Sequence, residues 1–155
     1  REFNDVFFSG TFGGEALSLA AARAVIDKFR REPVIDALWR KGAFIKREFG
    51  RVIDAYGLGD GIEIAGKEPW LVPVYSAAGA ASMEEVKTFM VKSMVEAGVL
   101  FGGSLNICYA HSEKDLQQVV DAFEGTVSRL RDEIGKPGLA DRLGCELIRP
   151  VFSVR

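Results

Sequence analysis

The order of helical and strand patterns along this chain allows few folds. Residues 62–65 and 70–75 are expected to form two antiparallel strands, because short apolar runs flank a turn at 66–69. Around this hairpin, four segments carry apolar residues at helical spacing. The expected helices cover residues 15–31, 33–56, 82–97 and 112–134. This order predicts an α+β fold, in which helices cover a small, mostly antiparallel sheet.

Shorter elements complete this prediction. Residues 3–8 and 106–110 are expected to form further strands, and a helical turn is expected at 139–143. Residues 147–154 fit either a last strand or an extended tail. Pro73 cannot donate a backbone hydrogen bond, so the strand that contains it is expected at an edge of the sheet.

The ends of the expected helices carry recognisable signals. Ser82 and Glu85 have the spacing of a capping box, in which each residue accepts a hydrogen bond from the backbone of the other. Ser112 is a typical N-cap residue. Gly57 follows the second helix, at a position where a left-handed backbone conformation favours glycine.

Two glycines interrupt the second helix. Gly42 and Gly50 each weaken a helix by up to about 1 kcal/mol relative to alanine, which predicts close packing at both positions. The buried face of this helix is expected to consist of large apolar side chains at helical spacing. These residues are Ile35, Leu38, Trp39, Ile45, Phe49, Val52 and Ile53.

Composition excludes several classes of partner. The 155 residues are 48% hydrophobic, carry a formal net charge of −2 and intersperse basic with acidic residues, so no nucleic-acid surface is expected. Neither a signal peptide nor an apolar run near the ~20 residues of a membrane helix is present in the sequence. Cys108 and Cys145 lack metal-site spacing and are expected to be buried free thiols. We therefore expect a cytoplasmic protein without a membrane partner.

A glycine-rich turn precedes the first helix. It contains Ser9, Gly10, Thr11 and Phe12, and two further glycines follow before Glu15. A hydroxyl and exposed backbone N–H groups at the start of a helix form an anion site, and glycine lets a phosphate approach the backbone closely. No Gly-Lys-Ser/Thr follows, so the turn is not a P-loop. A turn of this composition also serves simply to connect two elements, and both interpretations stay open.

Two motifs lie far apart in the chain. The first is Phe8-Ser9-Gly10-Thr11-Phe12-Gly13-Gly14, followed by Leu17-Ser18-Leu19-Ala20-Ala21-Ala22. The second is Gly98-Val99-Leu100, followed by Asn106-Ile107-Cys108-Tyr109-Ala110-His111-Ser112-Glu113-Lys114-Asp115. In their order and spacing they resemble class III aminotransferases that depend on pyridoxal phosphate (PLP), closest to the glutamate-1-semialdehyde 2,1-aminomutase branch.

The resemblance implies a role for the turn. The threonine that matches Thr11 donates to the cofactor phosphate, which the other subunit of a homodimer mainly binds, and Ser9, Gly10 and Phe12 line that approach. Glu15 stands where many relatives have asparagine, which leaves its role open. Residues 1–32 would then end the PLP-binding large domain of a fold-type I enzyme, and 33–155 would form its C-terminal small domain.

The resemblance places the catalytic groups outside this chain. The Schiff-base lysine and the aspartate that pairs with the pyridine nitrogen lie upstream in the family, so no catalytic residue is expected here. The lysines present, Lys41 among them, are expected to be solvated, whereas a nucleophilic lysine needs a desolvated pocket. A chain that opens on Arg1 without an initiator Met is expected to be the C-terminal segment of a larger enzyme.

The remaining polar residues predict structural roles. His111 is the only histidine, so no multi-histidine metal site is expected, and a structural hydrogen bond is the favoured role. In the family, an arginine near the C-terminus often holds a substrate carboxylate. Arg142, Arg149 and Arg155 are candidates for it by position alone.

Two functions follow as hypotheses. In the first, the parent is a PLP-dependent aminotransferase or aminomutase that moves an amino group from a small-molecule donor to a carbonyl acceptor, and the isolated chain is inactive. In the second, the chain is a non-catalytic α+β module for dimerisation or another interaction, because a fold does not decide a function. The sequence leaves the substrate open, and also the choice between aminomutase and transaminase.

Overall fold

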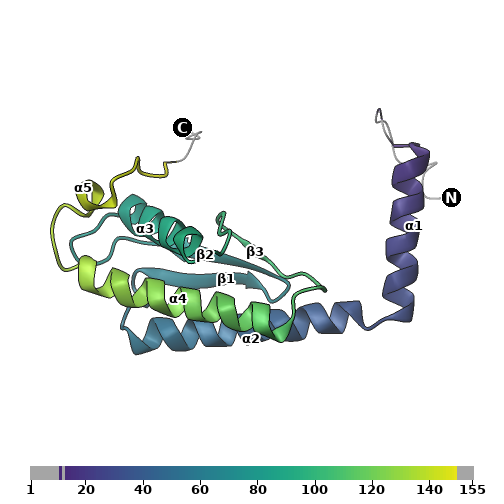
Figure 1. The fold of residues 1–155 in the computed structure, drawn as a ribbon, viewed down its shortest axis with the longest axis horizontal. Coiled ribbons are helices and arrows are strands. Elements are labelled where there is room, and N and C mark those ends of the chain that lie inside the picture. Colours follow the sequence, from purple (N-terminus) through teal and green to yellow (C-terminus); the bar gives the residue numbers. More distant parts are fainter. Residues whose placement is uncertain (1–10, 12, 150–155) are drawn as a thin grey trace, which may run out of the picture. The chain divides into compact units, whose positions relative to one another are not determined.

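The computed structural model describes Thr11 and residues 13–149 (Figure 1). The strand expected at 3–8 lies outside the described residues. The chain divides into two compact units, Arg1–Asp36 and Ala37–Arg155, which are described separately. The first unit contains helix α1 (Ala16–Arg31), whose predicted extent is confirmed to within a residue. None of the residues of α1 is buried.

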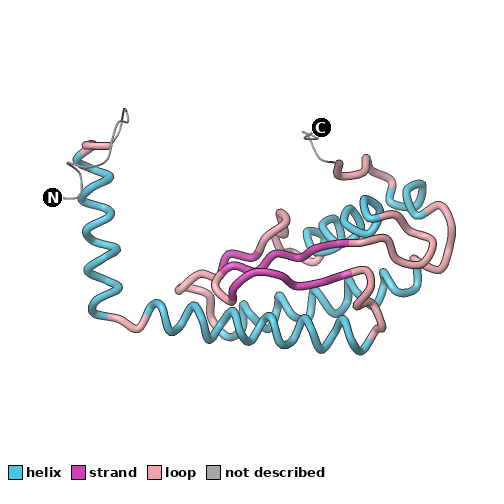
Figure 2. Tube along the Cα trace, turned by 180° about the vertical axis from the view of Figure 1, so that it is seen from behind, coloured by secondary structure: helices cyan, strands magenta, loops and turns pink. Residues whose placement is uncertain are grey.

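The second unit has the predicted α+β fold (Figures 1 and 2). A small antiparallel sheet of three strands lies against helices along one face. Helix α2 begins just before the division between the units. The elements are α2 (Val34–Ala55), β1 (Ile62–Lys67), β2 (Trp70–Tyr75), α3 (Met83–Glu96), β3 (Leu105–Asn106), α4 (Glu113–Glu133) and α5 (Leu139–Leu143).

Alternation along the hairpin decides which face of the sheet is covered. Leu71 and Tyr75 of β2 are buried, and so is Ile62, which lies opposite Tyr75 in β1. Their neighbours Trp70 and Val74 point to the other face and are 59% and 43% exposed. Successive side chains of a strand point to opposite faces, so a single register buries one apolar set against the helices.

The position of Pro73 corrects one prediction. Its strand, β2, is the middle strand in the order β1-β2-β3 rather than an edge strand. The amide of Ile107, just after β3, donates to the carbonyl of Pro69 at 3.0 Å. Backbone hydrogen-bonding groups alternate in direction along a strand, so those of residue 73, like those of residue 69, point to the side of β2 on which β3 lies. The pairing with β3 reaches only Trp70 and Leu71. At Pro73, no described strand lies on this side of β2, so no ladder hydrogen bond to such a strand is lost.

Predicted signals at the helix ends are confirmed. Ser82 and Glu85 form the capping box of α3, and Ser112 forms one with Asp115 at the start of α4. After α2, Gly57 has a φ of 64°. Its amide donates to Asp54 and that of Leu58 to Ile53, which are the two bonds of a Schellman motif.

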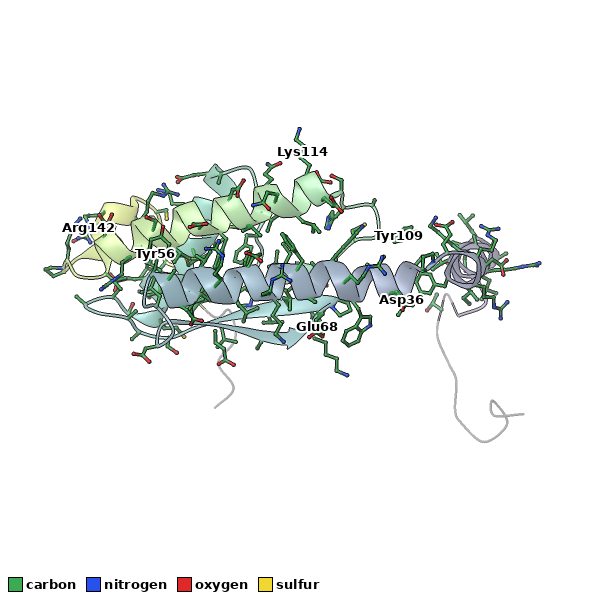
Figure 3. The ribbon with its side chains drawn as sticks, turned by 90° about the horizontal axis from the view of Figure 1, so that it is seen from below. Asp36, Tyr56, Glu68, Tyr109, Lys114 and Arg142 are labelled. Atoms are coloured by element: carbon green, nitrogen blue, oxygen red, sulfur yellow. The ribbon has the colours of Figure 1, made fainter. Side chains whose placement is uncertain are left out.

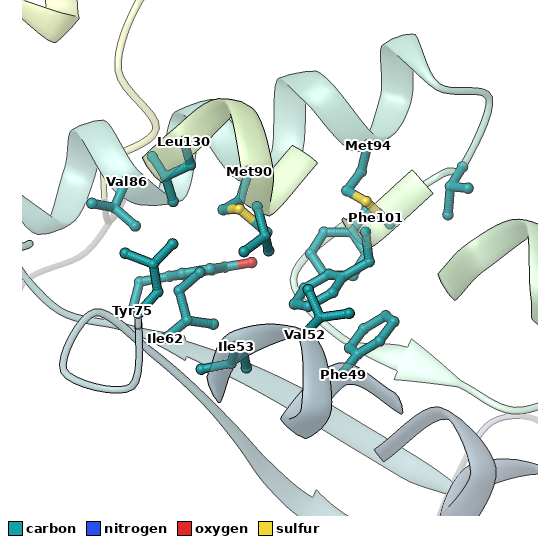
Figure 4. Packing of buried hydrophobic residues seen from close by; sticks show 14 of the residues in the cluster. Phe49, Val52, Ile53, Ile62, Tyr75, Val86, Met90, Met94, Phe101 and Leu130 are labelled. Atoms are coloured by element: carbon teal, nitrogen blue, oxygen red, sulfur yellow. The ribbon is translucent and has the colours of Figure 1, made fainter. Parts of the chain in front are cut away.

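The core of the second unit joins three helices to the sheet (Figure 4). Phe49 of α2 stacks on Phe123 of α4 with ring centroids 3.7 Å apart, and both side chains are fully buried. Met90 and Met94 of α3 are also fully buried. Tyr75 points into the same cluster, and burial raises the pKa of its hydroxyl.

Four further expectations need correction. At the start of α2, Val34 and Ala37 are buried, whereas Ile35 and Trp39 are 48% and 43% exposed. A buried face of small residues was not apparent from side-chain size alone. Of the strand expected at 106–110, only Asn106 lies in the observed strand β3. The two cysteines are free, as predicted, but exposed, because each lies in an irregular surface segment: Cys108 after β3 and Cys145 after α5.

No atom approaches within 4 Å of a Cβ placed at Gly50, so the close packing expected there is absent among the described residues.

Candidate functional site

Only one of the four predicted cofactor contacts can be placed. Thr11 lies exposed in a turn before α1. Ser9, Gly10 and Phe12 lie outside the described residues. Among the residues that are described, no hydrogen bond involves the side chain of Thr11. Within the described part of the chain, nothing occupies its hydroxyl.

Glu15 has a role that the sequence left open. It is the N-cap of α1, and its carboxylate accepts hydrogen bonds from the amides of Leu17 at 2.9 Å and Ser18 at 2.6 Å. Hydrogen bonds from the Ser18 hydroxyl, then from the two amides, lower the pKa of Glu15. Two of the free N–H groups that would attract an anion to this helix end are thus already occupied.

A second predicted motif forms a tightly bonded loop before α4 (Figure 3). The Nδ1 atom of His111 accepts a hydrogen bond from the amide of Cys108 at 3.2 Å, which confirms the structural role expected for this histidine. From α2, Lys41 donates to the carbonyls of Tyr109 and His111, each at 2.6 Å. Its ammonium also lies 5.4 Å from the centre of the Tyr109 ring.

Lys41 therefore differs from the solvated lysine that the sequence predicted. It is half-buried, and its ammonium donates to two backbone carbonyl oxygens. The contact fastens the loop at 107–112 to α2, which spacing along the sequence could not show, because the partners are 68 and 70 residues apart.

The candidate arginines are not equivalent. Arg142 donates to the Glu133 carboxylate at 2.6 Å and to the carbonyl of Pro137 at 2.6 Å. These bonds fasten α5 to the end of α4 and commit the guanidinium to a structural role. Arg149 is exposed, and Arg155 lies outside the described residues. Within the described part of the chain, no cluster of three or more His, Cys, Asp or Glu side chains has the arrangement of a metal site.

Comparison with known proteins identifies a shared fold. No protein-family model and no curated protein sequence matches the chain. Among solved structures, it is similar to the FumI protein of Sphingopyxis sp. MTA144, whose structure was solved in the PLP internal aldimine form. The TM-score is 0.71 at 18% sequence identity, and the match covers 90% of this chain. It covers 33% of the FumI chain, so this sequence spans about a third of that protein.

At this identity, the likeness shows the fold alone. It agrees with the α+β architecture predicted from the sequence, in which helices cover a small sheet. Among the described residues, no helix is both long and apolar enough to span a membrane.

Proposed function

We propose that this chain is the C-terminal part of a PLP-dependent enzyme. The observation that carries the proposal is the likeness over 90% of the chain to part of a protein solved with PLP. The motifs at 8–22 and 98–115 support it independently, because they were recognised from the residues alone. PLP would then be the cofactor of the complete protein.

The finer proposal concerns the reaction. The same motifs favour a class III aminotransferase or aminomutase, closest to the glutamate-1-semialdehyde 2,1-aminomutase branch. Its substrates would be a small-molecule amino donor and a carbonyl acceptor, and it would act as a cytoplasmic homodimer. Residues 1–32 would end its large domain, and 33–155 would form its small domain.

The residues present fit PLP in part. Thr11 offers an exposed hydroxyl that can donate to a phosphate oxygen. The start of α1 offers less than the sequence predicted, because Glu15 already accepts the Leu17 and Ser18 amides and adds a negative charge. We therefore assign the turn a single side-chain contact to the phosphate, and the remaining phosphate contacts to residues outside this chain.

This partial fit indicates which roles the cofactor and the residues of this chain would have. PLP supplies the electron sink that makes amino-group transfer possible when it is bound. Thr11 would orient the phosphate, and Lys41 would fasten the loop at 107–112 to α2. No described lysine has a site suited to nucleophilic catalysis, so the isolated chain is expected to be inactive.

Substitution of Thr11 in the complete enzyme tests the turn. Thr11→Ala removes the hydroxyl and should weaken PLP retention about tenfold, the effect of one hydrogen bond to a charged group. Thr11→Ser keeps the hydroxyl and serves as the matched control. PLP retained after dialysis is measured by visible absorbance. If both variants retained the same amount of PLP, Thr11 would not contact the phosphate through its hydroxyl.

The visible absorbance spectrum of the complete protein tests whether it is a PLP-dependent enzyme. A visible cofactor band that changes when an amino donor is added is the expected result. A colourless protein that PLP does not reconstitute would contradict the proposal and favour the interaction module.

A further inference from the structure

Helices α3, α4 and α5 border a groove of about 370 Å³. Apolar and charged side chains line it together, and Phe89, Leu139 and Leu143 supply the apolar part. All of these residues belong to the second unit. The groove is large enough for a molecule the size of an amino acid.

Most charges on the groove wall already have partners. Lys92 donates to the carbonyl of Leu143 at 2.8 Å and lies 3.5 Å from the Glu96 carboxylate. Arg142 pairs with Glu133 at 2.6 Å. These four charged groups cancel within the fold, so they offer a ligand little net attraction.

Arg129 and Asp132 of α4 are different. Both line the groove, yet neither forms an ion pair or hydrogen bond with another described side chain. The Arg129 guanidinium lies 6.0 Å from the centre of the Phe89 ring, which holds it at the groove. Residues three apart on a helix are neighbours, with about 5–6 Å between their Cβ atoms. The groove thus presents one positive and one negative group side by side.

Ser93 adds a buried polar group to the same groove. The residue is only 4% exposed and lines the groove, and its hydroxyl forms no hydrogen bond with a described residue. Its oxygen is not among the buried side-chain atoms that lack a partner, so solvent reaches it, and a ligand in the groove can bond to it.

We propose that this groove binds a small aliphatic α-amino acid. Its carboxylate would contact Arg129, its ammonium Asp132, and one of these groups would also bond to Ser93. An α-amino acid carries both charges on one carbon, which suits two opposite charges on adjacent turns of one helix. A ligand with a single charge leaves either Arg129 or Asp132 unmatched. The inference depends on residues of the second unit alone and not on the proposed PLP chemistry.

Titration with L-leucine, followed by amide NMR spectra of the 155-residue chain, tests the proposal. Saturable shifts are expected for amides of α3, α4 and α5 that border the groove. Two single-charge analogues share the leucine side chain: 4-methylpentanoate lacks the ammonium, and 3-methylbutylamine lacks the carboxylate. Each should bind at least about tenfold more weakly, because it loses a charge-assisted contact.

Three variants make the test specific. Arg129→Gln and Asp132→Asn should each weaken leucine binding about tenfold while the spectrum remains that of a folded protein. Arg131→Gln is the matched control, because Arg131 is exposed on the same helix and does not line the groove. Absence of saturable shifts, equal binding of either analogue, or unchanged binding by Arg129→Gln would overturn the proposal.

Discussion

Gly42 and Gly50 are the two glycines within α2, and their surroundings predict opposite responses to substitution. A Cβ at Gly42 would overlap the backbone of Glu68 in the β1–β2 turn, whereas a Cβ at Gly50 would meet no atom within 4 Å. Gly42→Ala should therefore destabilise the fold by about 1–3 kcal/mol, despite its better helix propensity. Gly50→Ala should stabilise it by up to about 1 kcal/mol. Urea unfolding of both variants measures the difference, and a common direction of change would contradict this account.

Lys41 is the residue whose structural role is easiest to isolate. Lys41→Met keeps the length of the side chain but removes both hydrogen bonds to the loop carbonyls of Tyr109 and His111. We expect a loss of about 1–3 kcal/mol in unfolding free energy and faster hydrogen exchange at the Cys108 amide. Lys114→Met is the control, because Lys114 is exposed and donates no hydrogen bond to another described residue. Exchange at Cys108 that stays as slow as in the unaltered protein would show that the loop does not need Lys41.

At the scale of elements, one carboxylate joins two helices. Glu85 accepts the Ser82 amide at the start of α3 and the Ala140 amide in α5, each at 2.8 Å. These backbone hydrogen bonds, that of Ser82 first, lower the pKa of Glu85 below its ordinary value of 4.5. Because the folded state holds the proton more weakly than the unfolded state, stability is full above pH 4.5. It is lost as the pH falls through the pKa of the folded state.

Glu85→Gln tests this linkage. The neutral amide cannot titrate, and one of its ends can no longer accept a hydrogen bond, so the variant should have a lower Tm at pH 7. Its Tm should also fall less steeply between pH 5 and pH 3 than that of the unaltered protein. Glu84→Gln is the control, because no hydrogen bond of the Glu84 side chain ties α3 to another described element. Equal pH dependence of both variants would assign the acid sensitivity to other carboxylates.

Local chemistry explains which elements could be predicted. The caps at Ser82 and Ser112 and the Schellman glycine Gly57 act within a few residues, so the sequence alone located those helix ends. β3 could not be predicted in the same way, because its length is set by where the chain meets β2. Likewise, nothing local distinguishes the buried Ala37 from the exposed Trp39.

The candidate sites show the same limit. The glycine-rich turn was visible in the sequence, but Glu15 as N-cap was not, because serine, threonine, aspartate and asparagine are the usual residues there. Ser93 and Arg129 line the same groove only because α3 packs on α4, so no sequence motif could have joined them. Tertiary packing creates this groove, whereas the Glu15 cap is a local contact made by a residue type that is unusual at this position.

For the whole molecule, the distribution of the core predicts where stability resides. Every member of the main apolar cluster lies at or after Ile45, and no residue of α1 is buried. Stability from apolar burial scales with the area removed from water, so the second unit should hold nearly all of it. α1 instead exposes large apolar side chains, including Leu17 at 77%, which suits a helix that a further part of the proposed parent enzyme would cover.

Removal of residues 1–32 tests this distribution. The truncated chain keeps Val34, the buried residue that starts α2, and the entire apolar cluster. Its unfolding free energy should change by less than about 0.5 kcal/mol, as for substitutions away from the core. Phe123→Ala provides the contrast: it removes a fully buried ring that stacks on Phe49 and should cost about 3–5 kcal/mol. If truncation lowered the Tm as much as Phe123→Ala, residues 1–32 would be an integral part of the core, and the second unit could not be regarded as an independently folding domain.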